Sequence, residues 1–377
     1  MAEKLKPVVL WLTENYYPNR GGMAQSCDRI VQSLRNLGLF IGLVHFRSSK
    51  NKLKMKTVQN GFYLAMPADE DSGHSYNVLL AFLSNPGNSY NFTHIVAFGG
   101  YLPVLGGPVL SKLLKIELVT FLRGNDFDSF IFSAKKRDFL FYAINNSKVI
   151  CTVTKEQKEK IEKLIPHHNV QYIPNGIDIA EWNPHTSELE NSKKWKSENV
   201  KSGKRVIGVF GHLKPKKGLD LFIHSVVLSG IQEKIFLLIS GETDKAIEQS
   251  LDAAGVDYFI SPFLDRFEML AWYPACDAVA IPSIYDGMPN VLLEAAALSI
   301  PIIASNVGGM RDILTEGKHG FIFLPADEQS CARAISRFIS SSEEELLRMG
   351  QNCKNLVKNS YTAEIEANSY FNLFTEY

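Results

Sequence analysis

Residues 278–296 read AVAIPSIYDGMPNVLLEAA and contain the signals of a strand, a turn and a helix in succession. The apolar run 278–281 predicts a buried strand, and Gly287 and Pro289 predict a turn after it. Asn290 has the side chain of a helix N-cap and precedes an apolar helical stretch. A buried strand that leads directly into a helix is the repeating unit of parallel sheets, so this stretch predicts an α/β fold.

The same unit recurs along the whole chain, because short apolar runs alternate with helical stretches. The predicted strands of the first half are 8–12, 41–46, 94–98, 117–122, 149–153 and 171–173, and those of the second half are 205–210, 235–240, 258–260, 278–281, 301–304 and 321–323. This order predicts a doubly wound parallel sheet in each half of the chain.

The polar, charge-rich segment 183–203 separates the two halves and is predicted to be a linker. The predicted domains are therefore 1–182 and 204–359, and a C-terminal helix at about 360–377 is expected to pack back on the first domain. Ligands of open α/β sheets bind beyond the carboxyl ends of the strands. We therefore expect two Rossmann-like domains that face each other across a ligand-binding cleft.

The composition argues against an intrinsically disordered chain, a collagen-like repeat and a coiled-coil rod. Hydrophobic residues make up 45% and charged residues 21% of the 377 residues, which is typical of folded globular chains. The 40 Lys and Arg balance the 40 Asp and Glu, so binding to nucleic acid is not expected. Residues 1–188 carry a net charge of +5 and residues 189–377 one of −5, so an anionic partner is expected on the first half.

The cysteines and the apolar segments bear on metal sites and on location. The five cysteines are scattered singly, without the spacing of a zinc site or a disulfide framework. The first apolar run is too short for a signal peptide. No window approaches the roughly 20 apolar residues of a membrane span. We expect a cytoplasmic protein, with peripheral contact at the inner membrane face as an addition.

Two glycine-containing loops are candidate phosphate sites. Gly21 and Gly22 follow the first strand and precede a helix, where free backbone N–H groups favour an anion. Gly211 to Gly218 (GHLKPKKG) follows the first strand of the second half and carries three lysines that could hold a diphosphate. An ordinary strand-to-helix turn and a solvated basic turn are the respective alternatives. The second loop lacks the spacing of a P-loop.

Glu294 is an acid within a run of Leu and Ala on the first turns of the helix after Asn290. A carboxylate there is costly to bury unless it receives hydrogen bonds, which sugar hydroxyls would supply. A helix residue that faces solvent is the alternative, and the pattern alone favours it.

These motifs together resemble glycosyltransferase family 4, the retaining transferases of the GT-B fold. Residues 286–295 resemble the family's EGxPxxxxEA signature. The resemblance extends, in the same order along the chain, to five other segments: GGMAQ at 21–25, RGND at 123–126, IPNGID at 173–178, GHLKPKKG at 211–218 and SNVGGM at 305–310. It therefore covers nearly the whole chain.

The resemblance implies a nucleotide-sugar site. Glu294 would bind the ribose hydroxyls, and Asp286 would contact the donor sugar. Lys217 and the backbone N–H groups of the segment from Gly287 to Val291, which includes Met288, Pro289 and Asn290, would hold the diphosphate. Gly21 and Gly22 would close over the phosphates from the other domain, and the nucleobase would lie near Ser261, Pro262 and Phe263.

Three positions depart from the family pattern. The first acid of the signature is Asp286 rather than Glu, which shortens its reach by one methylene. His212 replaces the usual Arg, so Lys214 or Lys216 would supply the cation. Arg123 stands where many relatives have His, and it can only donate hydrogen bonds. Arg123 is predicted either to bind the acceptor or a phosphate, or to pair structurally with Asp126 or Asp128.

Two further patterns have competing interpretations. The tripeptide 126–128 matches the DxD metal motif of GT-A transferases, but the two-sheet rhythm favours the other fold, and no metal or cofactor is expected. The segment 50–56 (KNKLKMK) alternates cations with apolar residues. It could attach the chain to an anionic membrane or a lipid-linked acceptor. An alternation of period two favours a solvated loop or an edge strand instead.

The predicted function is retaining transfer of a hexose-type sugar from a nucleoside diphosphate sugar to an acceptor hydroxyl that the sequence does not identify. The predicted catalytic residues are Asp286, Lys217, Arg123 and Asp126. Since Arg123 cannot act as a base, front-face attack is expected, with the departing phosphate taking the acceptor proton. The alternatives are a sugar-nucleotide epimerase of the same architecture and a catalytically weak sugar-nucleotide binding protein.

Overall fold

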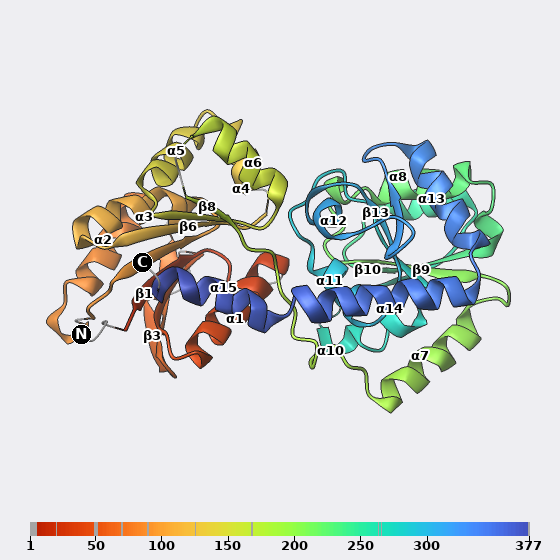
Figure 1. Cartoon of the computed structure of the whole chain (residues 1–377), viewed down its shortest axis with the longest axis horizontal. Helices are drawn as coiled ribbons and strands as arrows, with labels where there is room; N and C mark the ends of the chain where they lie inside the picture. The colour runs from red at the N-terminus through yellow and green to blue at the C-terminus, as the bar shows by residue number, and fades with distance from the viewer. Residues whose placement is uncertain are drawn as a thin grey trace. The chain divides into compact units, whose positions relative to one another are not determined.

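The computed structural model describes residues 6–19, 21–48, 52–68, 71–88, 90–124, 126–166, 169–262, 264 and 266–375 (Figure 1). The chain forms two compact units. Unit 1 comprises Met1–Asn175 and Ala363–Tyr377, and unit 2 comprises Gly176–Thr362. Among the described residues, no helix combines the length and the apolar character needed to cross a membrane.

Unit 1 contains an eight-stranded sheet in the order β3-β4-β2-β1-β5-β6-β7-β8. All neighbouring strands are parallel except the antiparallel edge pair β3 and β4. The strands are β1 (Val8–Thr13), β2 (Phe40–Ser48), β3 (Lys54–Val58), β4 (Gly61–Ala68), β5 (His94–Phe98), β6 (Glu117–Leu122), β7 (Val149–Thr152) and β8 (Val170–Tyr172). The predicted strands of the first half lie within a few residues of these bounds, whereas β4 was not predicted. The edge strand β3 overlaps the segment 50–56, for which an edge strand was one of the two favoured interpretations; Lys50 and Asn51 lie outside the described residues.

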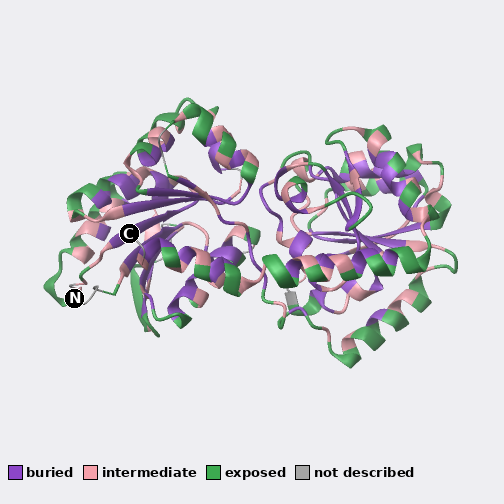
Figure 2. Ribbon diagram, viewed as in Figure 1, coloured by how far each residue is buried: buried purple, intermediate pink, exposed green. Residues whose placement is uncertain are grey.

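Helices cover both faces of this sheet, which is why its central strands are mostly apolar and buried over most of their length (Figure 2). Trp11 faces a core cluster shared with α15, and Leu10 and Leu12 face the opposite cluster, against which side chains of α2 and α3 pack. The helices are α1 (Gly22–Asn36), α2 (Ser72–Leu83), α3 (Tyr101–Leu114), α4 (Asp126–Ile131), α5 (Arg137–Asn146), α6 (Lys155–Leu164) and α15 (Ala363–Thr375).

Unit 2 contains a six-stranded parallel sheet in the order β11-β10-β9-β12-β13-β14. Its strands are β9 (Arg205–Phe210), β10 (Ile235–Ser240), β11 (Asp257–Ser261), β12 (Ala278–Ile281), β13 (Ile302–Ser305) and β14 (Gly320–Phe323). Its helices are α7 (Thr186–Asn199), α8 (Leu219–Leu228), α9 (Lys245–Ala254), α10 (Arg266–Met269), α11 (Asn290–Ala297), α12 (Gly308–Ile313), α13 (Glu328–Ser340) and α14 (Glu343–Ser360). Both units are Rossmann-like, so the predicted α/β class with two doubly wound domains is confirmed.

The segment predicted as a linker, 183–203, has a different structure. It forms α7, which belongs to unit 2, and the units divide between Asn175 and Gly176 instead. Trp195 packs its ring against Phe236, Phe259 and Trp272, with centroid separations of 5.9, 5.6 and 5.1 Å. The polar composition of this segment did not predict a packed helix, since a single large aromatic residue, Trp195, makes these ring contacts.

Candidate functional site

The two loops singled out in the second half leave neighbouring strands at the middle of the unit 2 sheet. From β9 the chain passes to β10 and β11 on one side, and β12, β13 and β14 lie on the other side. The carboxyl ends of β9 and β12 therefore flank the switch point of the sheet. Ligands of open α/β sheets bind at such a point, because two successive loops diverge there.

The side chains of these two loops meet. The Lys217 Nζ lies 2.5 Å from the Asp286 Oδ2, and the two side chains are 27% and 12% exposed. The Ser283 hydroxyl donates to the same carboxylate at 3.2 Å, and the backbone N–H of Ile284 donates to the Lys216 carbonyl at 2.8 Å. A cation and a carboxylate predicted from separate motifs thus form one partly exposed pair.

Two glycines allow the backbone segments to approach this closely. Gly218 has a φ of +68°, and a Cβ there would lie 2.1 Å from the Pro282 carbonyl oxygen. Gly308 has a φ of +47°, and a Cβ there would lie 2.1 Å from the Asp286 carbonyl oxygen. A side chain at either position would therefore move the loop that carries Asp286.

Helix α11 begins immediately after this loop. Its N-cap is Pro289, so the predicted N-cap, Asn290, is instead the first helical residue. Pro289 provides no side-chain cap, and the first N–H groups of a helix have no acceptor within it. Gly287 and Met288 are buried, whereas Asn290 and Val291 are partly exposed. The predicted diphosphate-binding segment therefore ends on the positive end of a helix dipole.

Glu294 lies on the second turn of α11 and is half-buried. It accepts a hydrogen bond of 2.6 Å from the hydroxyl of Tyr273, a side chain with no exposed surface. Burial raises the pKa of Tyr273 well above its ordinary value, and the Glu294 carboxylate raises it further. Tyr273 therefore remains a donor that fixes the carboxylate, which is not the environment of a helix residue that merely faces solvent. Tyr273 was not among the predicted site residues, since no motif marks it.

The remaining predicted donor residues surround the same strand ends. His212 is partly exposed and Lys214 is exposed. The Lys216 Nζ lies 5.3 Å from the centroid of the Tyr285 ring. Near the predicted nucleobase position, the Ser240 hydroxyl donates to the Pro262 carbonyl at 3.1 Å. Phe263 lies outside the described residues.

In unit 1, Gly21 and Gly22 lie after β1, which is flanked by β2 and β5 at the switch point of that sheet. Gly21 is the N-cap of α1 with a φ of +110°, and no side chain caps the helix there. Gly22 is exposed. The strand-to-helix geometry predicted for this loop is present, and its contact with phosphates stays a prediction.

Arg123 lies in the loop after β6 and is almost completely buried, with 1% of its side chain exposed. Its guanidinium donates to Glu366 at 3.2 Å, to the Tyr370 hydroxyl and to the Asn175 side chain. Burial alone would lower the pKa of Arg123, but the neighbouring Tyr370 and Glu366 outweigh it and hold the pKa above its ordinary value. The carboxylate that pairs with Arg123 is therefore Glu366 of α15, and not Asp126 or Asp128. A catalytic role for Arg123 stays a prediction.

The two aspartates of the DxD tripeptide have different partners. Asp126 is buried and accepts the backbone N–H groups of Arg123 at 3.2 Å and Gly100 at 3.5 Å. Asp128 pairs with Lys160 of α6 at 2.9 Å. Asp126 thus fixes the loop that carries Arg123, and its predicted catalytic role is not tested by these contacts.

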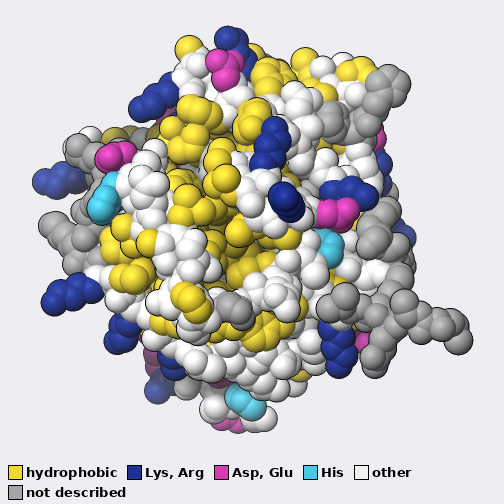
Figure 3. Space-filling view, turned by 90° about the vertical axis from the view of Figure 1, so that its left-hand side faces the viewer, with side chains coloured by type: hydrophobic (Ala, Val, Ile, Leu, Met, Phe, Trp, Pro, Cys, Tyr) yellow, Lys and Arg dark blue, Asp and Glu magenta, His cyan; other side chains and the backbone are white. Residues whose placement is uncertain are grey.

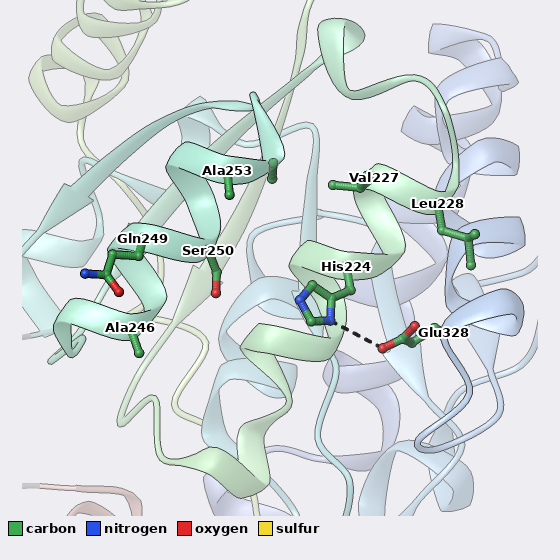
Figure 4. Close-up of a pocket in the computed structure, with 9 residues that line it drawn as sticks. His224, Val227, Leu228, Ala246, Gln249, Ser250, Ala253 and Glu328 are labelled. Atoms are coloured by element: carbon green, nitrogen blue, oxygen red, sulfur yellow. Dashed lines mark ion pairs between the residues drawn. The ribbon is translucent and has the colours of Figure 1, made fainter.

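A groove of about 620 Å³ lies elsewhere on unit 2, between α8 and α9 (Figure 4). His224 of α8 and Glu328 of α13 form a 3.5 Å pair at one side, and both side chains are about half exposed. Its lining includes none of the predicted donor-binding residues. The groove is therefore separate from the strand-end site.

Comparisons with known proteins give a family match within unit 2. Residues 191–356 match the model of the family described as Glycosyl transferases group 1. The chain is 28% identical over 218 residues to the capsular polysaccharide biosynthesis glycosyltransferase CapM of Staphylococcus aureus. This match covers 53% of each of the two chains. It is 24% identical over 346 residues to an uncharacterised glycosyltransferase of Methanocaldococcus jannaschii, which covers 91% of each. The first curated relatives are matched over about half of their length.

Solved structures share the fold over nearly the whole chain. Sucrose-phosphate synthase from Thermosynechococcus elongatus superposes with a TM-score of 0.81 at 16% identity and covers 98% of both chains. HepE of Anabaena, solved with UDP and glucose, has a TM-score of 0.77 at 18% identity and covers 98% of this chain and all of its own. These similarities show the GT-B fold, and the sequence matches are to glycosyltransferases.

Proposed function

We propose that the chain is a retaining glycosyltransferase that transfers a hexose-type sugar from a nucleoside diphosphate sugar to an acceptor hydroxyl without a metal ion. The observation that carries the proposal is the convergence of Lys217 and Asp286 from two loops at the switch point of the unit 2 sheet. The structural similarity to HepE, which was solved with UDP and glucose, supports a donor of this class.

The contacts in unit 2 suggest a division of roles. Glu294, held by Tyr273, accepts hydrogen bonds from the ribose hydroxyls. Lys217 and the first N–H groups of α11 bind the diphosphate. Asp286, released from Lys217 by the incoming phosphates, accepts hydrogen bonds from the sugar. Gly21 and Gly22 are proposed to contribute further backbone contacts to the phosphates.

The same residues account for catalysis. As the bond between the anomeric carbon and the phosphate oxygen breaks, negative charge grows on the diphosphate. A lysine and helix-end N–H groups that already point at this position stabilise the transition state more than the ground state. The acceptor oxygen then bonds to the anomeric carbon from the same face, and its proton passes to the departing phosphate. The anomeric configuration is thereby retained.

Titration with UDP, GDP and ADP sugars, followed by a transfer assay with the donor that binds, tests the proposal. Glu294→Ala is expected to lose donor binding, and the product is expected to keep the donor's anomeric configuration by NMR. Activity is expected to persist in the presence of a metal chelator.

Donor conversion without an acceptor would indicate an epimerase instead, and binding without transfer over a broad acceptor panel would indicate a binding protein. An inverted product would contradict the proposed mechanism.

A further inference from the structure

The segment 173–178 (IPNGID) leads the chain into unit 2 and contributes no residue to the candidate donor site. It ends in Asp178, whose carboxylate accepts the backbone N–H of Ala180 at 3.0 Å, and the backbone N–H of Trp182 donates to the Ile179 carbonyl at 3.2 Å. An aspartate that bonds to the backbone two residues further on fixes a turn. The backbone that carries Trp182 is therefore held by short-range hydrogen bonds.

Trp182 is buried, with 7% of its surface exposed. Apolar side chains are common on the surface of a protein, as Figure 3 shows for one face of this one, and they need no explanation there. The Trp182 ring, in contrast, meets the ring of Tyr273 edge to face, with a centroid separation of 5.6 Å and an interplanar angle of 88°. Such T-shaped pairs are a favoured arrangement of aromatic rings, so Trp182 restricts the orientation of Tyr273.

A second ring packs against Tyr273. Phe210, the last residue of β9, has its ring centroid 4.6 Å from that of Tyr273, at an interplanar angle of 64°. Gly208 makes room for this ring, because a Cβ at that position would lie 2.6 Å from two ring carbons of Phe210. Tyr273 itself has no exposed surface. A ring packed against two others in a dense interior has little freedom to change rotamer, so its hydroxyl is fixed in place.

The fixed hydroxyl acts on Glu294. The Glu294 carboxylate accepts from Tyr273 at 2.6 Å and is half-buried on α11. A glutamate side chain has several rotatable bonds, and a strong hydrogen bond from an immobile donor selects one of its orientations. Binding groups work best when packing and supporting hydrogen bonds hold them in the productive geometry. The orientation of Glu294 therefore depends on Trp182 through Tyr273.

We infer that Trp182 is a positioning residue for recognition of the donor's ribose: through Tyr273, it holds Glu294 in the orientation that binds the ribose hydroxyls. The inference rests on the proposed function, in which Glu294 accepts hydrogen bonds from these hydroxyls. It gives the segment 173–182 a role in nucleotide selectivity, since Asp178 fixes the turn and the turn places Trp182.

The ratio of two dissociation constants tests the inference. Calorimetry with the full chain would compare the nucleoside diphosphate of the donor that binds with its 2′-deoxyribose analogue. The parent is expected to bind the ribose form about tenfold or more tightly, because the analogue lacks a hydrogen bond to a carboxylate. Trp182→Leu is expected to lower this ratio about threefold or more, because Glu294 is then free to turn away from the hydroxyls. Its affinity for inorganic pyrophosphate, which has no ribose, should stay that of the parent.

Two variants separate positioning from stability. Phe338→Leu also removes a buried ring from unit 2, one that packs against Phe321 at 6.0 Å, so it and Trp182→Leu should both lower the thermal midpoint. Only Trp182→Leu should lower the ratio. Trp182→Phe keeps an aromatic ring beside Tyr273 and should restore the ratio to near that of the parent.

An exposed residue tests the same series of contacts without emptying the core. Asp178 is exposed, and Asp178→Ala loosens the turn before Trp182, so it should lower the ratio to a smaller extent. Asp244→Ala is the matched control, since this exposed carboxylate accepts the backbone N–H of Ile247 at 3.0 Å at the start of α9. It should leave the ratio unchanged.

An unchanged ratio in Trp182→Leu would overturn the inference alone and leave the proposed function standing. If that variant does not fold, an unchanged ratio in Asp178→Ala would do the same. Equal losses in Phe338→Leu would also overturn the inference, because the effect would then follow stability. A parent that does not prefer the ribose form would remove both the ribose contact proposed for Glu294 and the role of Trp182.

Discussion

Lys217 in unit 2 and Arg123 in unit 1 are both cations in loops after parallel strands, yet their surroundings differ. Lys217 is 27% exposed and contacts the carboxylate of Asp286. Arg123 is 1% exposed and contacts three side chains that come from α15 and from the end of unit 1's first segment. An exposed cation can exchange its partner for a ligand, whereas Arg123 cannot do so without depriving the buried Glu366 carboxylate of one of its two arginines.

Because their surroundings differ, we expect different effects when Arg123 and Lys217 are replaced. Arg123 should matter for the stability of unit 1, and Lys217 should matter for turnover. Four measurements test this difference between the two units.

Replacing Arg123 should have the largest effect. Arg123→Met leaves the buried Glu366 carboxylate without one of its two arginines, and removal of one partner from a buried pair costs about 3–5 kcal/mol. Denaturant unfolding should show this loss. The matched control is Lys160→Met, whose exposed pairs with Asp128 and Glu156 should contribute about 1 kcal/mol or less. Equal losses in both variants would abolish the distinction.

Replacing Lys217 should act on turnover rather than on stability. Lys217→Ala should lower kcat at least 10²-fold, or about 3 kcal/mol, because a contact with charge that develops in the transition state is removed. Its partly exposed pair with Asp286 should contribute about 1 kcal/mol or less to unfolding. Lys214→Ala is the control on the same loop and should retain more of the activity. Unchanged kcat in Lys217→Ala would remove Lys217 from the catalytic set.

Acid should destabilise unit 1 through His45. This side chain is fully buried beside the Tyr63 hydroxyl, and burial lowers its pKa to about 4. Between about pH 6.5 and pH 4 the unfolded chain binds a proton that the folded chain does not, so stability falls as the pH falls through that range. The loss should reach about 2–3 kcal/mol. Unfolding free energies of the parent and His45→Gln should therefore converge in acid; parallel pH profiles would contradict this assignment.

Replacing Tyr273 should have the smallest effect and should appear in donor binding. Tyr273→Phe removes the hydrogen bond to Glu294 and frees the carboxylate to turn, which should weaken donor binding about tenfold, as for a bond to a charged group worth ~1.5 kcal/mol. Calorimetric titration can measure the change. Tyr258→Phe on β11 is a control, since its hydroxyl contacts Asp252 instead. A lower unfolding free energy of Tyr273→Phe with unchanged donor affinity would make Tyr273 purely structural.

Much of the fold could be predicted because each central strand is buried on both faces and therefore reads as an apolar run. Strands β3 and β4 escaped this criterion, as β3 is an exposed edge strand and β4 contains Gly61 and Pro67. The Asn60-Gly61 pair, where the turn after β3 enters β4, is a hairpin signal that could have revealed both strands.

The candidate site was predictable where one motif carries it and not where distant segments meet. Residues 282–294 lie within a single strand-turn-helix unit, so their neighbourhood follows from spacing. Tyr273 reaches Glu294 from before β12, and Glu366 reaches Arg123 across 243 positions of the chain. Such pairs are set by tertiary packing, which local patterns do not encode.

The placement of α15 also determines how the protein can be divided experimentally. The chain passes between the units twice, and the two passages are joined in unit 2 where the Ile177 N–H donates to the Tyr361 carbonyl at 2.9 Å. Tyr370, Leu373 and Phe374 of α15 are buried in the core of unit 1. A fragment that stops at residue 175 would therefore expose that core. Independent expression of unit 1 calls for residues 363–375 to be rejoined to it, by a short graft or by complementation with a synthetic peptide.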